Sequence, residues 1–131
     1  MRGPRRSRRG MSLIELLMAS ALLLIAVVPI TDALWRGAAM ARDIQMRTKA
    51  TLLAQQEMEA ALALAADDFT RDPGKSSAPL GDGYLVTITG VAVGLTKTIS
   101  VQVGWDRDKS GSLGSTEVLV ALKTIAANVG S

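Results

Sequence analysis

A single carboxylate lies within an apolar segment near the start of the chain. Glu15 is the fifth residue after Gly10, and residues 16–31 contain no charged side chain. Across residues 13–35 only Glu15 and Asp32 are charged, and as a helix this segment would be about 34 Å long, enough to span a bilayer. An ionisable group at membrane depth costs about 2.5–3.5 kcal/mol on insertion scales. We therefore expect Glu15 to have a partner of opposite charge.

A second group of oxygen-bearing side chains lies between residues 106 and 117. Its members are Asp106, Asp108, Ser110, Ser112 and Glu117. Their spacing matches the D-x-[DN]-x-[DNS]-G-x5-E calcium loop, in which alternate oxygens, a glycine turn at Gly111 and a final bidentate carboxylate surround the cation. An EF-hand loop is flanked by helices, whereas we expect strands on both sides of this one. The positive charges of Arg107 and Lys109 would also weaken cation binding. A solvated hairpin loop has the same composition, so the sequence leaves both a calcium site and a plain hairpin open.

The composition narrows the function classes. The chain has no cysteine and no histidine, so an exported domain must fold without disulfides, and the commonest general base and metal ligand is missing. The net charge of +3 comes from five arginines before Gly10; without residues 1–10 there are 10 basic and 12 acidic residues. The positive net charge therefore belongs to the N-terminal tail, and we do not expect a nucleic-acid partner. Because the sequence has no nucleophile–base pair and no phosphate-binding loop, we do not expect enzymatic activity either.

The elements that position these residues begin with one long helix over residues 11–66. Its first part is apolar all round, and residues 36–66 are rich in good helix formers. Pro29 removes a backbone hydrogen bond, so we expect a kink or a locally melted turn at residues 25–29. At 100° per residue a narrow seam forms in the second part, and it should pack on another element. The predicted seam consists of Met40, Ile44, Thr51, Met58 and Leu62.

The rest of the chain predicts a small sheet. Residues 67–83 have two prolines and three glycines, which is typical of a loop. Residues 84–89, 96–105 and 117–124 alternate apolar and polar side chains, which favours antiparallel strands. Because so few strands are marginal alone, we expect the apolar face of a sheet of about three to four strands to pack on the helix. The predicted fold is α+β.

The first residues also resemble a known family. Residues 10–19, Gly-Met-Ser-Leu-Ile-Glu-Leu-Leu-Met-Ala, are similar to the class III leader junction of type IV pilins and type II secretion pseudopilins. The resemblance implies that a membrane prepilin peptidase cuts after Gly10 and methylates the new N-terminus at Met11. It also implies that Glu15 pairs with the terminal amine of a neighbouring subunit. Five arginines before the apolar segment keep the N-terminus cytoplasmic by the positive-inside rule.

The later residues resemble one part of this family more closely. Residues 53–59, 99–105 and 117–124 are similar to minor pilins of the V type and to the minor pseudopilin called I. This implies a filament subunit that primes assembly at the tip, with other minor and major pilins or pseudopilins, the inner-membrane assembly platform and membrane lipid as partners. Met11 replaces the usual phenylalanine, Pro29 comes early, and the C-terminal cysteine pair of many major pilins is missing.

The resulting organisation has five segments. These are a cleaved basic leader (1–10), a transmembrane assembly helix (11–35), an amphipathic periplasmic half of the same helix (36–66), a loop (67–83) and a periplasmic sheet domain (84–131). Three alternatives remain: an export signal cut near Ala39–Ala41, a plain single-pass anchor, and a membrane-anchored periplasmic binding module that does not assemble. The expected location is the bacterial inner membrane and then the filament.

Overall fold

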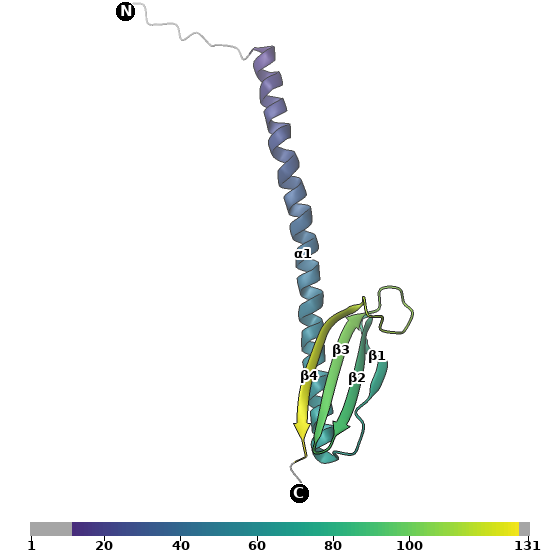
Figure 1. The fold of residues 1–131 in the computed structure, drawn as a ribbon. Helices are drawn as coiled ribbons and strands as arrows, with labels where there is room; N and C mark the ends of the chain where they lie inside the picture. Colours follow the sequence, from purple (N-terminus) through teal and green to yellow (C-terminus); the bar gives the residue numbers. More distant parts are fainter. Residues whose placement is uncertain (1–11, 129–131) are drawn as a thin grey trace, which may run out of the picture. The chain divides into compact units, whose positions relative to one another are not determined.

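A computed structural model describes residues 12–128 and has the predicted α+β fold (Figure 1). Its elements are α1 (Leu13–Asp67), β1 (Lys75–Gly81), β2 (Tyr84–Val93), β3 (Thr96–Trp105) and β4 (Val118–Ala127). The chain divides into two compact units, one ending at Ala41 and the other beginning at Arg42. We call their described parts, residues 12–41 and 42–128, the anchor unit and the sheet unit, and describe each by itself.

The anchor unit consists of the first half of α1. The helix begins after Ser12, whose carbonyl accepts the Glu15 N–H at 3.0 Å. It continues through Pro29 without interruption, so the locally melted turn expected at residues 25–29 is wrong. Pro29 removes only one hydrogen bond, and the turns on both sides are intact. The Thr31 hydroxyl donates to the Val28 carbonyl at 2.8 Å and so adds a contact beside the proline.

In the sheet unit the second half of α1 packs on the sheet through small side chains. The buried residues of the helix are Ala50, Ala54, Met58, Ala61 and Ala65. The predicted seam is confirmed at Met58 and Leu62, which pack in the core, and is wrong at Met40 and Ile44, which are 70% and 61% exposed. The buried positions follow spacings of three and four residues. The alanines at these positions belong to the same core cluster as the inner side chains of the sheet.

The sheet is an antiparallel meander with the order β1-β2-β3-β4. The predicted alternation of β3 is confirmed, because Ile99, Val101 and Val103 are fully buried against the helix. Val86 of β2 lies opposite Val103, and both belong to the core. The bounds of β3 are those predicted, whereas β2 and β4 each extend beyond their predicted ends.

Strand β1 lies within the segment that was predicted to be a loop. It contains Pro79 and ends at Gly81, and its pairing with β2 shows two register shifts. Ser77 has φ at 46°. Proline is tolerated on an edge strand because its missing N–H faces away from the neighbouring strand. The loop prediction failed because these residues signal turns in isolation, whereas pairing with β2 makes them a strand.

Three lysines make contacts that hold the parts of the sheet unit together. Lys75 pairs with Glu57 of α1 at 2.6 Å, and Lys49 of α1 pairs with Asp82. The third, Lys97, is 4% exposed, and its ammonium donates to the carbonyls of Phe69 and Arg71. A buried ammonium needs such partners, so Lys97 fixes the chain directly after α1.

Candidate functional site

Glu15 lies in the first turn of α1, among exposed aliphatic side chains. Its neighbours Leu13 and Ile14 are 81% and 68% exposed. Between residues 12 and 128 no ion pair involves Glu15. The sequence-predicted processing residues Gly10 and Met11 lie outside the described residues, so their geometry stays a prediction.

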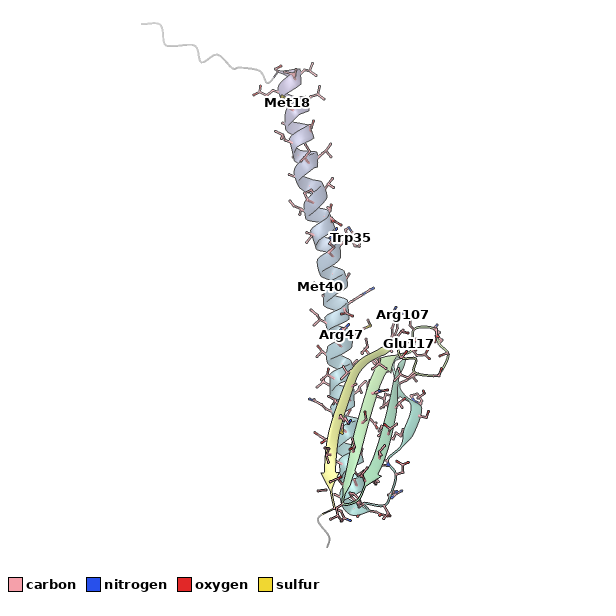
Figure 2. All side chains as sticks on the ribbon, in the orientation of Figure 1. Met18, Trp35, Met40, Arg47, Arg107 and Glu117 are labelled. Atoms are coloured by element: carbon pink, nitrogen blue, oxygen red, sulfur yellow. The ribbon has the colours of Figure 1, made fainter. Side chains whose placement is uncertain are left out.

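The other carboxylate of the apolar segment has a partner. Asp32 accepts from the Arg36 guanidinium at 2.9 Å, one helical turn away. Trp35, which follows in the same turn, is 77% exposed (Figure 2). One carboxylate of the segment is thus neutralised within the helix, whereas Glu15 is not neutralised by any described residue. This difference is the main electrostatic feature of the anchor unit.

The surface of the anchor unit is apolar around the whole helix. Among the described residues α1 is the one helix that is long and apolar enough to cross a membrane, judged by length and composition. The side chains of its most apolar stretch are not buried. The side chains of Met18 and Trp35 stand out from the helix in Figure 2. These properties fit a single-pass membrane anchor.

The acidic loop, residues 106–117, brings three carboxylates together at one end of the sheet unit. Oxygens of Asp106, Asp108 and Glu117 all lie within 4.8 Å of one another. Backbone N–H groups hold the first and last carboxylates: Ser110 and Gly111 donate to Asp106, while Arg107 and Gly114 donate to Glu117. Figure 2 shows Arg107 and Glu117 at this end of the sheet.

The hydroxyl group of Ser110 forms its hydrogen bonds within the loop. The Ser110 hydroxyl donates to the Ser112 carbonyl at 3.1 Å. Hydrogen bonds from Ser110, first from its side chain and then from its backbone, lower the pKa of the Asp108 carboxyl from its ordinary value. Asp108 therefore stays ionised in mildly acidic solution. The loop offers the charge and the oxygen atoms that Ca²⁺ requires, while its internal hydrogen bonds are also those of a plain hairpin.

Two contacts that hold this loop were not predicted from the sequence. The Leu113 N–H donates to the Ser77 hydroxyl of β1 at 2.9 Å. A Cβ atom at Gly104 would lie 2.2 Å from the Glu117 carbonyl oxygen and 2.4 Å from Leu113 Cδ1. Gly104 thus permits a close approach that any larger residue would block. A glycine at the end of an otherwise alternating strand was the available signal.

Comparisons with known proteins match the start of the chain. Residues 5–31 match the family model described as the prokaryotic N-terminal methylation motif. No curated protein and no solved structure matches the chain. The matched range includes Glu15 and the apolar first half of the anchor unit. The residues of the leader junction thus carry a motif that supports a pilin-like protein, whose usual role is that of a structural subunit assembling with other pilin subunits.

Proposed function

We propose that this chain is a minor pilin or pseudopilin, a structural subunit of a type IV pilus or of a type II secretion pseudopilus. In this proposal the prepilin peptidase cuts after Gly10 and methylates Met11. The apolar helix then holds the subunit in the inner membrane with the sheet unit in the periplasm. The subunit finally joins the filament and primes its assembly near the tip.

The observation that carries the proposal is the difference between the two carboxylates of the apolar segment. Asp32 is paired with Arg36, whereas Glu15 lies among exposed aliphatic side chains and has no ion pair within residues 12–128. Cleavage after Gly10 creates an ammonium group close in sequence to Glu15. In low dielectric an unpaired charge is more costly than a paired one. The Glu15 carboxylate of one subunit therefore neutralises the new N-terminus of its neighbour and sets the register between them.

The matched motif supports the cleavage step, and the later resemblance supports the minor-subunit role. The small sheet unit folds without disulfides, because the chain has no cysteine. Other pilins or pseudopilins, the assembly platform and membrane lipid are the proposed partners. The competing function is a membrane-anchored binding module that never assembles.

Mass spectrometry of the intact protein tests processing directly. We expect a mature chain that begins at Met11 and carries one methyl group, and we expect Gly10→Ala to retain the arginine-rich leader. The wild-type chain retaining residues 1–10 in assembled filaments would exclude the proposal.

Paired substitutions of the two carboxylates test assembly. Glu15→Gln removes the charge that the neighbouring N-terminus needs, so we expect incorporation into filaments to fall about tenfold or more, with membrane insertion unchanged. Asp32→Asn is the matched control, because Asp32 already has Arg36 within its own helix. Quantitative blotting of sheared filaments measures both variants. Equal incorporation of Glu15→Gln and wild type would contradict the pairing.

Calcium binding by the acidic loop is a second candidate role. The favouring observation is the convergence of Asp106, Asp108 and Glu117 within 4.8 Å, with Ser110 and Ser112 between them. Calcium titration followed by Trp105 fluorescence in a Trp35→Phe background tests it. Saturable binding that Glu117→Gln weakens supports the site. No response at millimolar calcium identifies the loop as a plain hairpin.

A further inference from the structure

The two edges of the sheet differ in how well they resist pairing with another strand. Edge strand β1 has a proline at position 79, two register shifts and a positive φ at Ser77, which are features that prevent edge-to-edge pairing. Edge strand β4 has ten residues, neither proline nor glycine, and one charged residue, Lys123. From Val120 to Ala127 it pairs with β3 without a shift.

The other edge of β4 is open in the described part of the chain. Within residues 12–128, β4 is the last strand of the sheet and is hydrogen-bonded to β3 alone (Figure 1). A regular, mostly apolar edge of this length is a template for strand addition.

The hydrogen bonds at the end of the ladder identify the groups that face outward. The Asn128 N–H donates to the Leu95 carbonyl at 2.8 Å, one step beyond the pair Thr96–Ala127 in the same register. Because bonded pairs alternate in an antiparallel ladder, the even-numbered residues of β4 from Val120 onward bond to β3. The N–H and C=O groups of the odd-numbered residues face outward. These residues are Ala121, Lys123, Ile125 and Ala127.

The inner side chains of β4 are incompletely covered. Leu122 is half-buried and packs against the core, whereas Val101, which lies opposite it on β3, is fully buried. Val120 shows the same difference from Val103. A strand added beyond β4 would cover these side chains and remove more apolar surface from water.

We propose that the free edge of β4 binds an extended segment of a different protein chain, which pairs with it as a fifth strand. The segment has apolar side chains on the face toward α1 and a carboxylate on the other face beside Lys123. Opposite charges across a pair of strands stabilise it. A second copy fits less well, since near-complete antiparallel pairing of two β4 strands places the two Lys123 side chains opposite or diagonal to each other. The inference rests on the sheet unit and not on processing at Gly10.

Peptide binding to the full chain in detergent micelles tests the inference. The probe is a synthetic ten-residue peptide of alternating valine and threonine, with one glutamate on the threonine face. A matched peptide carries lysine in place of glutamate. We expect the glutamate peptide to bind more tightly and to slow hydrogen exchange at the outward amides of residues 121–127, measured by nuclear magnetic resonance. No binding at millimolar peptide, or protection elsewhere, would overturn the proposal.

Two substitutions of the edge make the test specific. Ala121→Pro removes an outward N–H and leaves the bonds to β3 in place, so we expect peptide affinity to fall about tenfold with an unchanged melting temperature. Ala121→Thr keeps the N–H and is the control that should bind like wild type. Lys123→Glu should reverse the preference between the two peptides. Normal binding by Ala121→Pro, or dimers of the chain cross-linked through β4 without peptide, would refute the proposed occupant.

Discussion

The two halves of α1 show how one helix can serve two environments. In the anchor unit large aliphatic side chains are exposed around the helix, such as Leu24 at 63% and Ile25 at 71%. In the sheet unit the helix buries small residues, with Ala50 and Ala54 at 0% exposure. Large apolar side chains therefore lie on the exposed part of the helix, and small ones lie where the chain's own sheet covers them.

The same contrast holds for charged groups. In the sheet unit the buried ammonium of Lys97 has two carbonyl partners within the chain. In the anchor unit Glu15 has no ion pair with any described residue. Within residues 42–128 every buried side-chain nitrogen and oxygen has a hydrogen-bond partner, whereas the outer edge of β4 is unpaired. By contrast, the anchor unit exposes large aliphatic side chains and a carboxylate without an ion pair to any described residue.

The largest effect should come from the core of the sheet unit. Ile99 is fully buried, so Ile99→Ala loses both transfer energy and packing, and we expect about 2–5 kcal/mol less free energy of unfolding. Leu24→Ala is the control from the anchor unit, and it should change the unfolding of the sheet unit by less than about 0.5 kcal/mol. Denaturant titration of Trp105 fluorescence in a Trp35→Phe background measures both. Equal losses would show that the two units do not unfold separately.

A smaller effect should follow from enlarging the alanine stripe. Ala54→Leu inserts three carbons where the helix and the sheet are in contact, and overpacking of this kind costs about 1–3 kcal/mol. Ala60 is exposed on the same helix, so Ala60→Leu is the matched control and should be nearly neutral. The same denaturant titration compares them. If both variants were equally stable, tight packing of Ala54 against the sheet would not explain why alanine is buried there.

The sequence predicted this division of the helix only in part. The apolar length and the helix-forming composition gave its extent to within two residues at each end, because these signals are local. The first half of the seam was misplaced because it was sought among larger residues such as Met40 and Ile44, whereas most of the buried positions of the helix are alanines. Strand β1 was missed because proline and glycine, here Pro79 and Gly81, are typical of turns, and only the pairing with β2 gives this segment its strand structure.

The candidate sites were predictable to the extent that their residues are close in sequence. The spacing of Asp106, Asp108 and Glu117 indicated that their carboxylates would meet, and they do. The contact of Leu113 with Ser77 joins the loop to β1, and the close approach at Gly104 depends on where the chain places Glu117 and Leu113. The first contact has no local sequence signal, and the signal for the second was a glycine at the end of an otherwise alternating strand. Calcium binding stays a prediction, as does the pairing of Glu15.

Removing the buried ammonium tests whether the sheet unit is internally satisfied. Lys97→Met keeps most of the apolar stem and leaves the carbonyls of Phe69 and Arg71 without their donor, which costs about 1–3 kcal/mol. Lys123→Met, on the exposed side of β4, is the control and should be nearly neutral. Hydrogen exchange in residues 68–72 should rise in the first variant alone. Unchanged exchange there would show that Lys97 does not fix the segment after α1.

The smallest expected effect is the pH dependence of the exposed pair between α1 and the β1–β2 turn. The side-chain hydrogen bond with Lys49 lowers the pKa of Asp82, and the same bond raises the pKa of Lys49. A carboxyl with a lowered pKa stabilises the fold above its unfolded-state pKa, and this contribution is lost as pH falls below about 4. The contribution of a lysine with a raised pKa is complete below its unfolded-state pKa and is lost as pH rises above about 10. Both groups are exposed, so solvent screening keeps the effect small. The melting temperatures of the wild type and of Asp82→Asn should differ between about pH 4 and about pH 10 and converge outside this range. Identical curves would show that the contact between helix and turn contributes nothing to the stability of the sheet unit.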